Sequence, residues 1–158
     1  MHRLNKAFFV LTVSLALLGG VSVVDYSQTL GDFQDAGIVA EQIETEIRSG
    51  EVAEGEFVLQ VEIRNPTRFT LDLNGAYMAA SADGDRLAYG PIVNHDEIPE
   101  TIPARGAVNV EYVFALSDDQ AQGLQAVLDD GTVTVTGQHS VQLRDTQFSV
   151  SFTGEVDG

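Results

Sequence analysis

The sequence predicts an all-β fold, an antiparallel β-sandwich with one short helix, preceded by an N-terminal transmembrane helix. Two observations support this prediction. Apolar and polar residues alternate in several segments, which is the two-residue period of half-buried strands. Gly, Pro, Asn and Asp residues separate those segments at short intervals, and these residue types favour turns.

The clearest strand covers residues 57–64. Every second residue in it is apolar: Phe57, Leu59, Val61 and Ile63. Pro66 cannot donate a hydrogen bond to a sheet ladder and moves Asn65 out of the helical region, so the strand ends there. We expect the Asn65 side chain to satisfy backbone groups in the following turn.

The segment before this strand leaves two alternatives open. Val39, Ile43 and Ile47 would share one face of a helix, whereas Ile43 and Ile47 also fit a strand pattern. A turn signal at Ser49–Gly50 favours an antiparallel pair with the strand 57–64, and a short helix remains the alternative. Residues 25–37 are polar and weakly patterned, and we expect them to form a stalk.

A second alternation runs from Phe69 to Ala80 and is followed by Asp83–Gly84. This dipeptide is typical of a type I′ hairpin, because both central positions of that turn need a positive φ. The returning strand, residues 86–90, stops at Pro91.

A loop containing Pro99 and Pro103 leads into another alternating strand, residues 108–116. Ser117 and Gln120 then form a capping box, which predicts a helix ending near Leu128.

Two further strands follow, residues 133–143 with a bend at Gly137, and residues 148–152. About seven strands with one helix between two late ones indicate an immunoglobulin-like or fibronectin-III-like sandwich over residues 38–156.

Residues 7–24 form an uncharged apolar stretch that is long enough to span a membrane. Arg3 and Lys6 precede it and the first acidic residue, Asp25, follows it. The positive-inside rule therefore predicts a cytoplasmic tip at residues 1–6 and a single-pass membrane protein whose domain is extracellular.

A cleaved signal peptide is the rival interpretation of the same segment. Residues 11–18 would be its apolar region and Gly20-Val21-Ser22 its cleavage site, which would give a secreted protein. The apolar character continues through Val23 and Val24, which favours retention as an anchor.

The chain has 158 residues with 24 acidic and 8 basic side chains, a formal net charge of −16. Binding phosphates needs a basic face, so the charge excludes nucleic acid as a partner. Lys is absent after Lys6, and the acidic residues are spread along the chain, which suggests a halophilic protein. An acidic domain from a mesophile is the alternative. No cysteine is present, so the chain has neither a disulfide nor a thiolate metal site.

Candidate chemistry is sparse. His95-Asp96-Glu97 lacks the spaced ligands of a metal site, and His139 and Ser140, as neighbours in a strand, point to opposite faces. We therefore expect His95 in a solvated loop and His139 packed in the fold or at a sheet edge. Acidic turns at Asp83-Gly84-Asp85 and Asp129-Asp130-Gly131 lack a calcium-loop pattern, and weak cation binding there stays open. We expect no catalytic residue, no cofactor and no small-molecule substrate.

The order of strand edges and turns resembles the group 2 late-embryogenesis-abundant family, also called the water stress and hypersensitive response (WHy) domain, over residues 38–152. The elements that carry the resemblance are Val61 to Thr67, Phe69 to Tyr77, Asp83-Gly84, Ala88-Tyr89-Gly90, Ile102-Pro103-Ala104 and Val108 to Phe114. The matching motif residues are Asn65, Pro66, Thr67, Tyr89, Gly90, Ile102 and Pro103, to which the resemblance assigns a structural role. Thr67-Arg68 departs from the usual residues after the proline, and the acidic surface is extreme.

The resemblance implies a non-enzymatic protein associated with desiccation, salt or other water stress. Together with the apolar N-terminal segment, it predicts a membrane-tethered domain that binds or shields other exported proteins. A dedicated accessory module of one cell-envelope complex is the alternative, and its docking surface would be a sheet edge or the loop 98–103.

Overall fold

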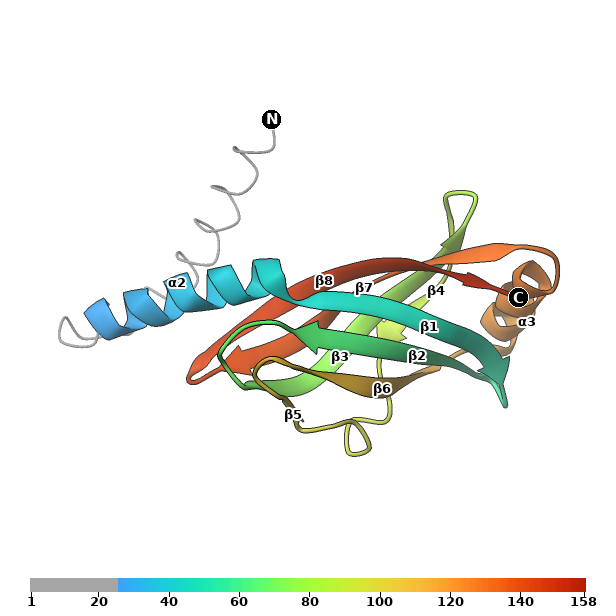
Figure 1. The fold of residues 1–158 in the computed structure, drawn as a ribbon. Helices are drawn as coiled ribbons and strands as arrows, with labels where there is room; N and C mark the ends of the chain where they lie inside the picture. Colours follow the sequence, from blue (N-terminus) through green and yellow to red (C-terminus); the bar gives the residue numbers. More distant parts are fainter. Residues whose placement is uncertain (1–25) are drawn as a thin grey trace.

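The computed structural model describes residues 26–158, with side chains from residue 31 onward. This part of the chain forms eight strands and two helices (Figure 1). The predicted cytoplasmic tip, residues 1–6, and the predicted membrane anchor, residues 7–24, lie outside the described residues.

The elements follow one another as a helix, six strands, a second helix and two strands. Their bounds are α2 (Tyr26–Gln42), β1 (Glu44–Ala53), β2 (Glu56–Asn65), β3 (Leu71–Ala82), β4 (Asp85–Pro91), β5 (Thr101–Ile102), β6 (Gly106–Ala115), α3 (Asp118–Asp130), β7 (Thr132–Leu143) and β8 (Thr146–Asp157).

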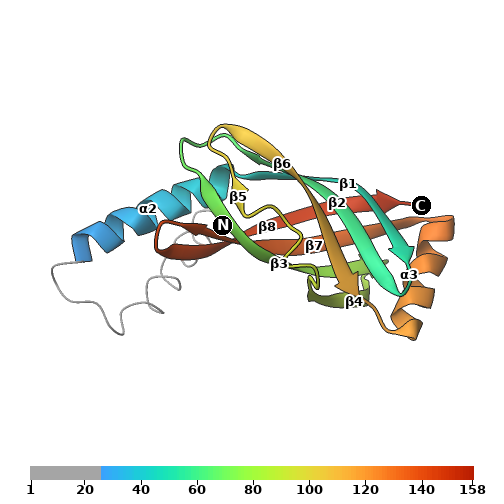
Figure 2. The same ribbon diagram turned by 90° about the horizontal axis from the view of Figure 1, so that it is seen from below.

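The strands form two sheets in which all pairs are antiparallel. The smaller sheet has the order β1-β2-β6, and the larger has the order β4-β3-β7-β8 with β5 paired to β3. Seen from below, α2 and α3 lie at opposite ends of the sheets (Figure 2). The mostly β, antiparallel architecture predicted from the sequence is therefore present.

One hydrophobic core lies between the two sheets. Alternate residues of each strand point inward, as the predicted two-residue period requires. The smaller sheet contributes Phe57, Leu59, Val61, Ile63, Val110, Tyr112 and Phe114, and the larger contributes Leu71, Leu73, Met78, Ala80, Val133, Val135 and Val141.

The hairpin between β1 and β2 turns later than the sequence suggests. Ser49 and Gly50 lie within β1, next to a register shift between Ile47 and Ser49. The turn is instead at Glu54 and Gly55, both of which have positive φ. The predicted turn at Ser49–Gly50 is therefore wrong, because a small polar pair can mark a bulge as well as a turn.

The hairpin between β3 and β4 is the one predicted. Asp83 and Gly84 have φ values of 51° and 86°, as the central residues of a type I′ turn require. The two strands pair directly on either side of it, from Ala82 opposite Asp85 to Tyr77 opposite Pro91.

The helix α3 begins with the predicted capping box. The Ser117 hydroxyl accepts a hydrogen bond from the Gln120 backbone N–H, and the Gln120 side chain accepts one from the Ser117 N–H. Leu124 and Leu128 are buried against the end of the core.

The sequence predicts one short helix after the anchor, and the described residues contain two. The additional helix, α2, covers residues 26–42, and β1 begins at Glu44. The ambiguous segment 38–48 is thus helical at its start and extended afterwards. Ala36 and Val39 are buried, so one side of α2 packs on the sandwich beside β8.

Among the described residues, neither helix combines the length and the apolarity that a membrane crossing needs.

Candidate functional site

The motif residue Asn65 is buried at the end of β2, with 1% of its surface exposed. Its Nδ2 donates to the carbonyl oxygens of Phe69 at 2.6 Å and Pro103 at 3.1 Å. Its Oδ1 accepts from the backbone N–H of Thr67 at 3.1 Å and from the Thr67 hydroxyl at 2.6 Å. One amide therefore joins the end of β2, the turn before β3 and the loop between β5 and β6.

Neighbouring groups complete this junction. The Arg105 N–H donates to the Thr67 carbonyl at 2.9 Å, and Ile102 is fully buried. A Cβ placed on Gly106 would lie 2.8 Å from Cγ of Pro103, so the loop and β6 approach closely. These contacts give the junction a structural role and leave no polar group of Asn65 free for a ligand.

The motif residues do not all come together. Asn65, Thr67, Ile102 and Pro103 meet at the junction, and Pro66 lies exposed in the same turn. Tyr89 and Gly90 are on β4 instead, where Tyr89 is 57% exposed and pairs with Ala79.

The second buried polar cluster centres on His139, on β7. Its Nε2 lies 2.8 Å from the Thr45 hydroxyl and its Nδ1 lies 2.8 Å from the Tyr112 hydroxyl. The imidazole also stacks on the Phe152 ring, with centroids 4.5 Å apart. Because Thr45 and Tyr112 belong to the smaller sheet, the cluster joins the two sheets through hydrogen bonds.

Burial sets the protonation of this cluster. It lowers the pKa of His139 from 6.5 to about 3 and raises the pKa of Tyr112 above its ordinary value. His139 is therefore neutral at physiological pH. The prediction of a packed histidine is confirmed, since no part of His139 is exposed.

Sequence reasoning did not identify the partners of His139. Thr45 is 94 residues away in the chain and Tyr112 is 27 residues away. Both occupy inward positions of strands, which is a signal of burial but not of a shared hydrogen bond.

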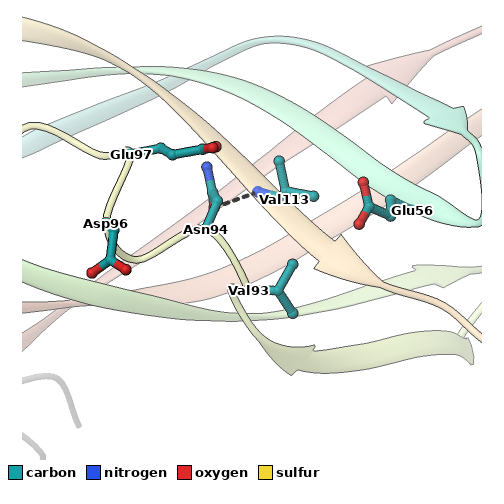
Figure 3. Close-up of a pocket in the computed structure, with 6 residues that line it drawn as sticks. All are labelled: Glu56, Val93, Asn94, Asp96, Glu97 and Val113. Carbon is teal, nitrogen blue, oxygen red and sulfur yellow. Dashed lines mark hydrogen bonds between the residues drawn. The ribbon is translucent and has the colours of Figure 1, made fainter.

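An open pocket of about 350 Å³ lies between the loop after β4 and the start of β2. Its lining residues are Glu56, Val93, Asn94, Asp96, Glu97 and Val113 (Figure 3). The carboxylates of Asp96 and Glu97 point in different directions in this view, and His95 does not line the pocket. The pocket thus lacks a convergent set of acids, and the sequence-based expectation of a solvated loop at His95, which is exposed, is confirmed.

The pocket loop also covers part of a sheet edge. The Asn94 side chain accepts from the Val113 N–H at 3.0 Å and donates to the Glu111 carbonyl at 2.9 Å. The Val93 N–H donates to the Val113 carbonyl at 2.8 Å. Loop and side chain therefore replace a neighbouring strand along this part of β6, which protects an edge that would otherwise be open to pairing.

The acidic turns do not form a metal site. Asp83 lies in the β3–β4 turn, and Asp129 and Asp130 end α3. Within the described part of the chain, no group of three or more His, Asp or Glu side chains is arranged to hold a metal ion.

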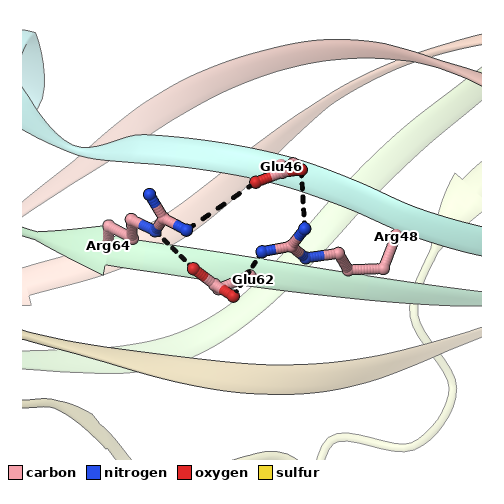
Figure 4. Close-up of polar contacts among 4 residues, drawn as sticks. All are labelled: Glu46, Arg48, Glu62 and Arg64. Carbon is pink, nitrogen blue, oxygen red and sulfur yellow. Dashed lines mark hydrogen bonds and ion pairs between the residues drawn. The ribbon is translucent and has the colours of Figure 1, made fainter.

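The outer face of the smaller sheet carries an ion-pair network (Figure 4). The Glu62 carboxylate lies between Arg48, at 2.7 Å, and Arg64, and Glu46 pairs with Arg48 at 2.7 Å. Hydrogen bonds from Arg48 and then Arg64 lower the pKa of Glu62. The four residues lie on the neighbouring strands β1 and β2. Their ion pairs therefore hold charged side chains in position on the outer face of the smaller sheet.

A second ion pair attaches α2 to the sandwich. The Arg144 guanidinium, in the β7–β8 turn, lies 2.5 Å from Asp32 and 3.4 Å from Asp35. The same guanidinium lies 5.4 Å from the centre of the Phe69 ring. This contact could not be predicted from the sequence, because residues 25–37 have no clear period.

Neither the His139 cluster nor the pocket combines a nucleophile, a base and access to solvent. The one buried His–hydroxyl cluster is closed to solvent, and the pocket contains neither a nucleophile nor a base held by a third group.

Comparison with known proteins gives similarity in structure alone. No family model matches the chain, and no curated protein matches it. It is similar to a solved protein from Archaeoglobus fulgidus at 13% identity, covering 72% of this chain and 90% of the other, with a TM-score of 0.46.

Two further solved structures are similar at the same level. A putative late embryogenesis abundant protein shares 13% identity over 85% of this chain and 86% of its own, with a TM-score of 0.42. A protein from Arabidopsis thaliana shares 13% identity over 73% of this chain and 78% of its own, also with a TM-score of 0.42. These values assign no family.

Proposed function

We propose that this chain is a non-enzymatic protein of water or salt stress, tethered to the membrane by residues 7–24, whose extracytoplasmic domain binds or shields other exported proteins. The finer fold that goes with this proposal is an immunoglobulin-like or fibronectin-III-like sandwich of the WHy kind. Three properties support it: the acidic surface, the hydrogen bonding of the buried polar side chains, and the resemblance of the sequence to the WHy family.

The observation that carries the proposal is the acidic surface. All 24 acidic residues lie at Asp25 or later, and none of the acidic side chains that the structure describes is buried. Four carboxylates in that region, Asp32, Asp35, Glu46 and Glu62, form ion pairs with arginines. Most of the surface charge therefore faces water, and such a surface retains hydration and repels similar chains.

The buried polar groups support a binding or shielding role over catalysis. In the described part of the chain, every buried side-chain nitrogen or oxygen atom has a hydrogen-bond partner. Asn65 and His139 are thus engaged in holding the sandwich together, and neither is available to a substrate.

The test is crosslinking in intact cells that make the full-length chain. Amine-reactive reagents would fail because Lys6 is the only lysine, so a photo-reactive amino acid is placed at Val93, which is 51% exposed beside the pocket. In the matched control, the photo-reactive amino acid replaces Gln122, which is exposed on α3. Products are identified by mass spectrometry with and without osmotic stress.

A broad set of exported proteins, crosslinked from position 93 more than from 122 and increasing under stress, is the expected result. One partner recovered in near-stoichiometric amount would replace the proposal with the accessory-module alternative. Crosslinks to cytoplasmic proteins alone would overturn the proposed topology.

A further inference from the structure

The outer face of the larger sheet differs in chemistry from the rest of the protein. The pairing of β4, β3, β7 and β8 places three rows of residues side by side on this face. The rows are Pro91, Tyr77, Gln138 and Ser151; Tyr89, Ala79, Thr136 and Thr153; and Gly75, Ser140 and Ser149. We call these eleven residues the neutral face, because none of them is charged.

The neutral face is a specific feature of one sheet. On the smaller sheet, the corresponding outer face carries the Arg48–Glu62 network and the acids around it. On the larger sheet, charged residues of the strands lie only at the borders of the three rows, such as Arg86 and Glu155 at one end and Asp72 at the other. A chain with a net charge of −16 thus keeps its largest sheet free of charge across the middle.

Two tyrosines project from this face. Tyr77 is 48% exposed and Tyr89 is 57% exposed, which makes them two of the four large apolar or aromatic residues exposed in the described chain. They lie on neighbouring strands in adjacent rows, since Tyr77 is opposite Pro91 and Tyr89 is opposite Ala79. Diagonal neighbours of this kind are about 7–8 Å apart.

Amide and hydroxyl groups surround the tyrosines. Gln138 is directly opposite Tyr77 and Ser151, and Thr136 is opposite Thr153. The side chains are exposed at all of these positions. Each amide or hydroxyl group both donates and accepts hydrogen bonds without adding charge.

We propose that the neutral face binds a neutral polysaccharide. A sugar ring presents one C–H face that can stack on a tyrosine ring, and a rim of hydroxyl groups that match amide and hydroxyl side chains. The eleven residues carry no charge, so a neutral ligand can bind to them without an ion pair. The nearest strand charge is the Arg86 guanidinium at the border of the face, 5.4 Å from the centre of the Tyr89 ring. The site goes beyond the proposed stress function. It borders the pocket loop, since a Cβ on Gly75 would lie 3.3 Å from Nδ1 of His95.

Other occupants fit less well. A second copy of this chain would need an interface with an apolar centre, whereas this face is mainly hydroxyl and amide groups. An anionic membrane surface attracts basic side chains, and the face has none within its rows.

The test measures how three soluble glucans bind to the purified full-length chain, which is kept in a polyoxyethylene detergent that contains no sugar. Laminarin and dextran are the neutral probes, dextran sulfate is the charged one, and calorimetry is run in dilute and in molar NaCl. We expect a Kd below about 1 mM for at least one neutral glucan. The affinity should not depend on salt, because no ion pair forms.

Three substitutions on the face should weaken that binding. Tyr77→Ala and Tyr89→Ala should each lower the affinity about tenfold, and Gln138→Glu should lower it similarly by adding a charge of nearly the same shape. Gln122→Glu makes the same chemical change on α3 and should bind as the wild type does. Thermal unfolding of every variant shows whether the fold is intact.

The proposal is overturned if neither neutral glucan binds, or if the Tyr77→Ala/Tyr89→Ala double variant binds as well as the wild type. Tyrosine-dependent self-association in sedimentation velocity, without glucan binding, would identify a second copy as the occupant. These results do not depend on client capture in cells, so failure here leaves the proposed stress function standing.

Discussion

Asn65 and His139 show how single buried polar residues hold this sandwich together. The Asn65 amide bonds to backbone groups of three segments, and both nitrogens of His139 meet hydroxyl groups of the other sheet. A buried polar group is costly only when its partners are missing, and here both residues have theirs. Replacing either residue should therefore lower the free energy of unfolding.

Replacing Asn65 with Ala should destabilise the fold strongly. The change leaves the Pro103 carbonyl and the Thr67 N–H without their buried partner, at about 1–3 kcal/mol for each orphaned group. Chemical denaturation of the full-length chain in molar salt measures the loss. Asn109→Ala, at an exposed position of β6, is the control and should change the free energy of unfolding by less than about 0.5 kcal/mol. Equal effects of the two substitutions would contradict the role of the junction.

His139 should make stability depend on pH. Its pKa is about 3 in the folded chain, against 6.5 as the ordinary value, so below pH 6.5 the unfolded chain binds a proton that the folded chain does not. The contribution of His139 to the free energy of unfolding is then constant above pH 6.5. It decreases as the pH falls from 6.5 towards 3, by up to about 1.4 kcal/mol per pH unit.

The carboxylates also titrate at low pH, so the His139 effect is measured by comparison between variants. His139→Gln should be less stable at neutral pH but should depend less on pH between 6.5 and 5 than the wild type. Asn109→Ala, at an exposed position of β6, should keep the wild-type profile. An NMR titration in which the folded His139 ring becomes protonated near pH 6.5 would contradict its closed environment.

At the scale of elements, the sequence pattern predicted the turns and helix caps that depend only on residues near one another in the chain. The capping box at Ser117 and the positive-φ turn at Asp83–Gly84 need only their own few residues, and both are present. The helix α2 depends instead on contacts with distant β8, so its residues carry a weak local signal. The bulge at Ser49 fits the pairing of β1 with β2, which a turn signal alone does not reveal.

The candidate sites follow the same rule. The junction at Asn65 could be anticipated because Asn-Pro ends a strand and its amide can reach the turn. That the Pro103 carbonyl, 38 residues away, accepts a hydrogen bond from Asn65 could not be read from periodicity. The neutral face likewise requires the register of four strands before its residues form rows.

The close packing of β7 on β8 should make Gly137 intolerant of a side chain. A Cβ there would lie 2.4 Å from Cζ of Phe152 and 2.7 Å from the Tyr77 carbonyl oxygen. Gly137→Ala must therefore displace the Phe152 ring that stacks on His139, which should cost about 1–3 kcal/mol.

Gly123 offers the matched substitution in a helix. Nothing lies within 4 Å of its Cβ position, in the middle of α3, so Gly123→Ala should stabilise the chain by up to about 1 kcal/mol. Thermal unfolding of both variants should shift the midpoint in opposite directions. A neutral or stabilising Gly137→Ala would show that the two strands are less tightly packed than described.

At the scale of the whole molecule, charge repulsion opposes the packing of the core. The chain has a net charge of −16, and its few arginines are partly used in the Glu62 network and at Asp32. Repulsion among exposed carboxylates acts over the Debye length, which falls from about 30 Å at 0.01 M salt to about 3 Å at 1 M. Salt should thus stabilise the fold, although it weakens each surface ion pair.

We expect the unfolding midpoint of the full-length chain to rise by about 5 °C or more between 0.01 M and 1 M NaCl, on the order of 1–2 kcal/mol for a domain of this size. A variant with Glu51→Gln, Glu54→Gln and Glu155→Gln removes three exposed charges outside the ion pairs described above, and its midpoint should rise less steeply with salt. Arg48→Gln is the opposite case, since it removes a positive charge from the Glu62 network and should steepen the dependence. Salt-independent melting of all three proteins would mean that the acidic surface is not under electrostatic strain, and the expectation of a halophilic protein would fail with it.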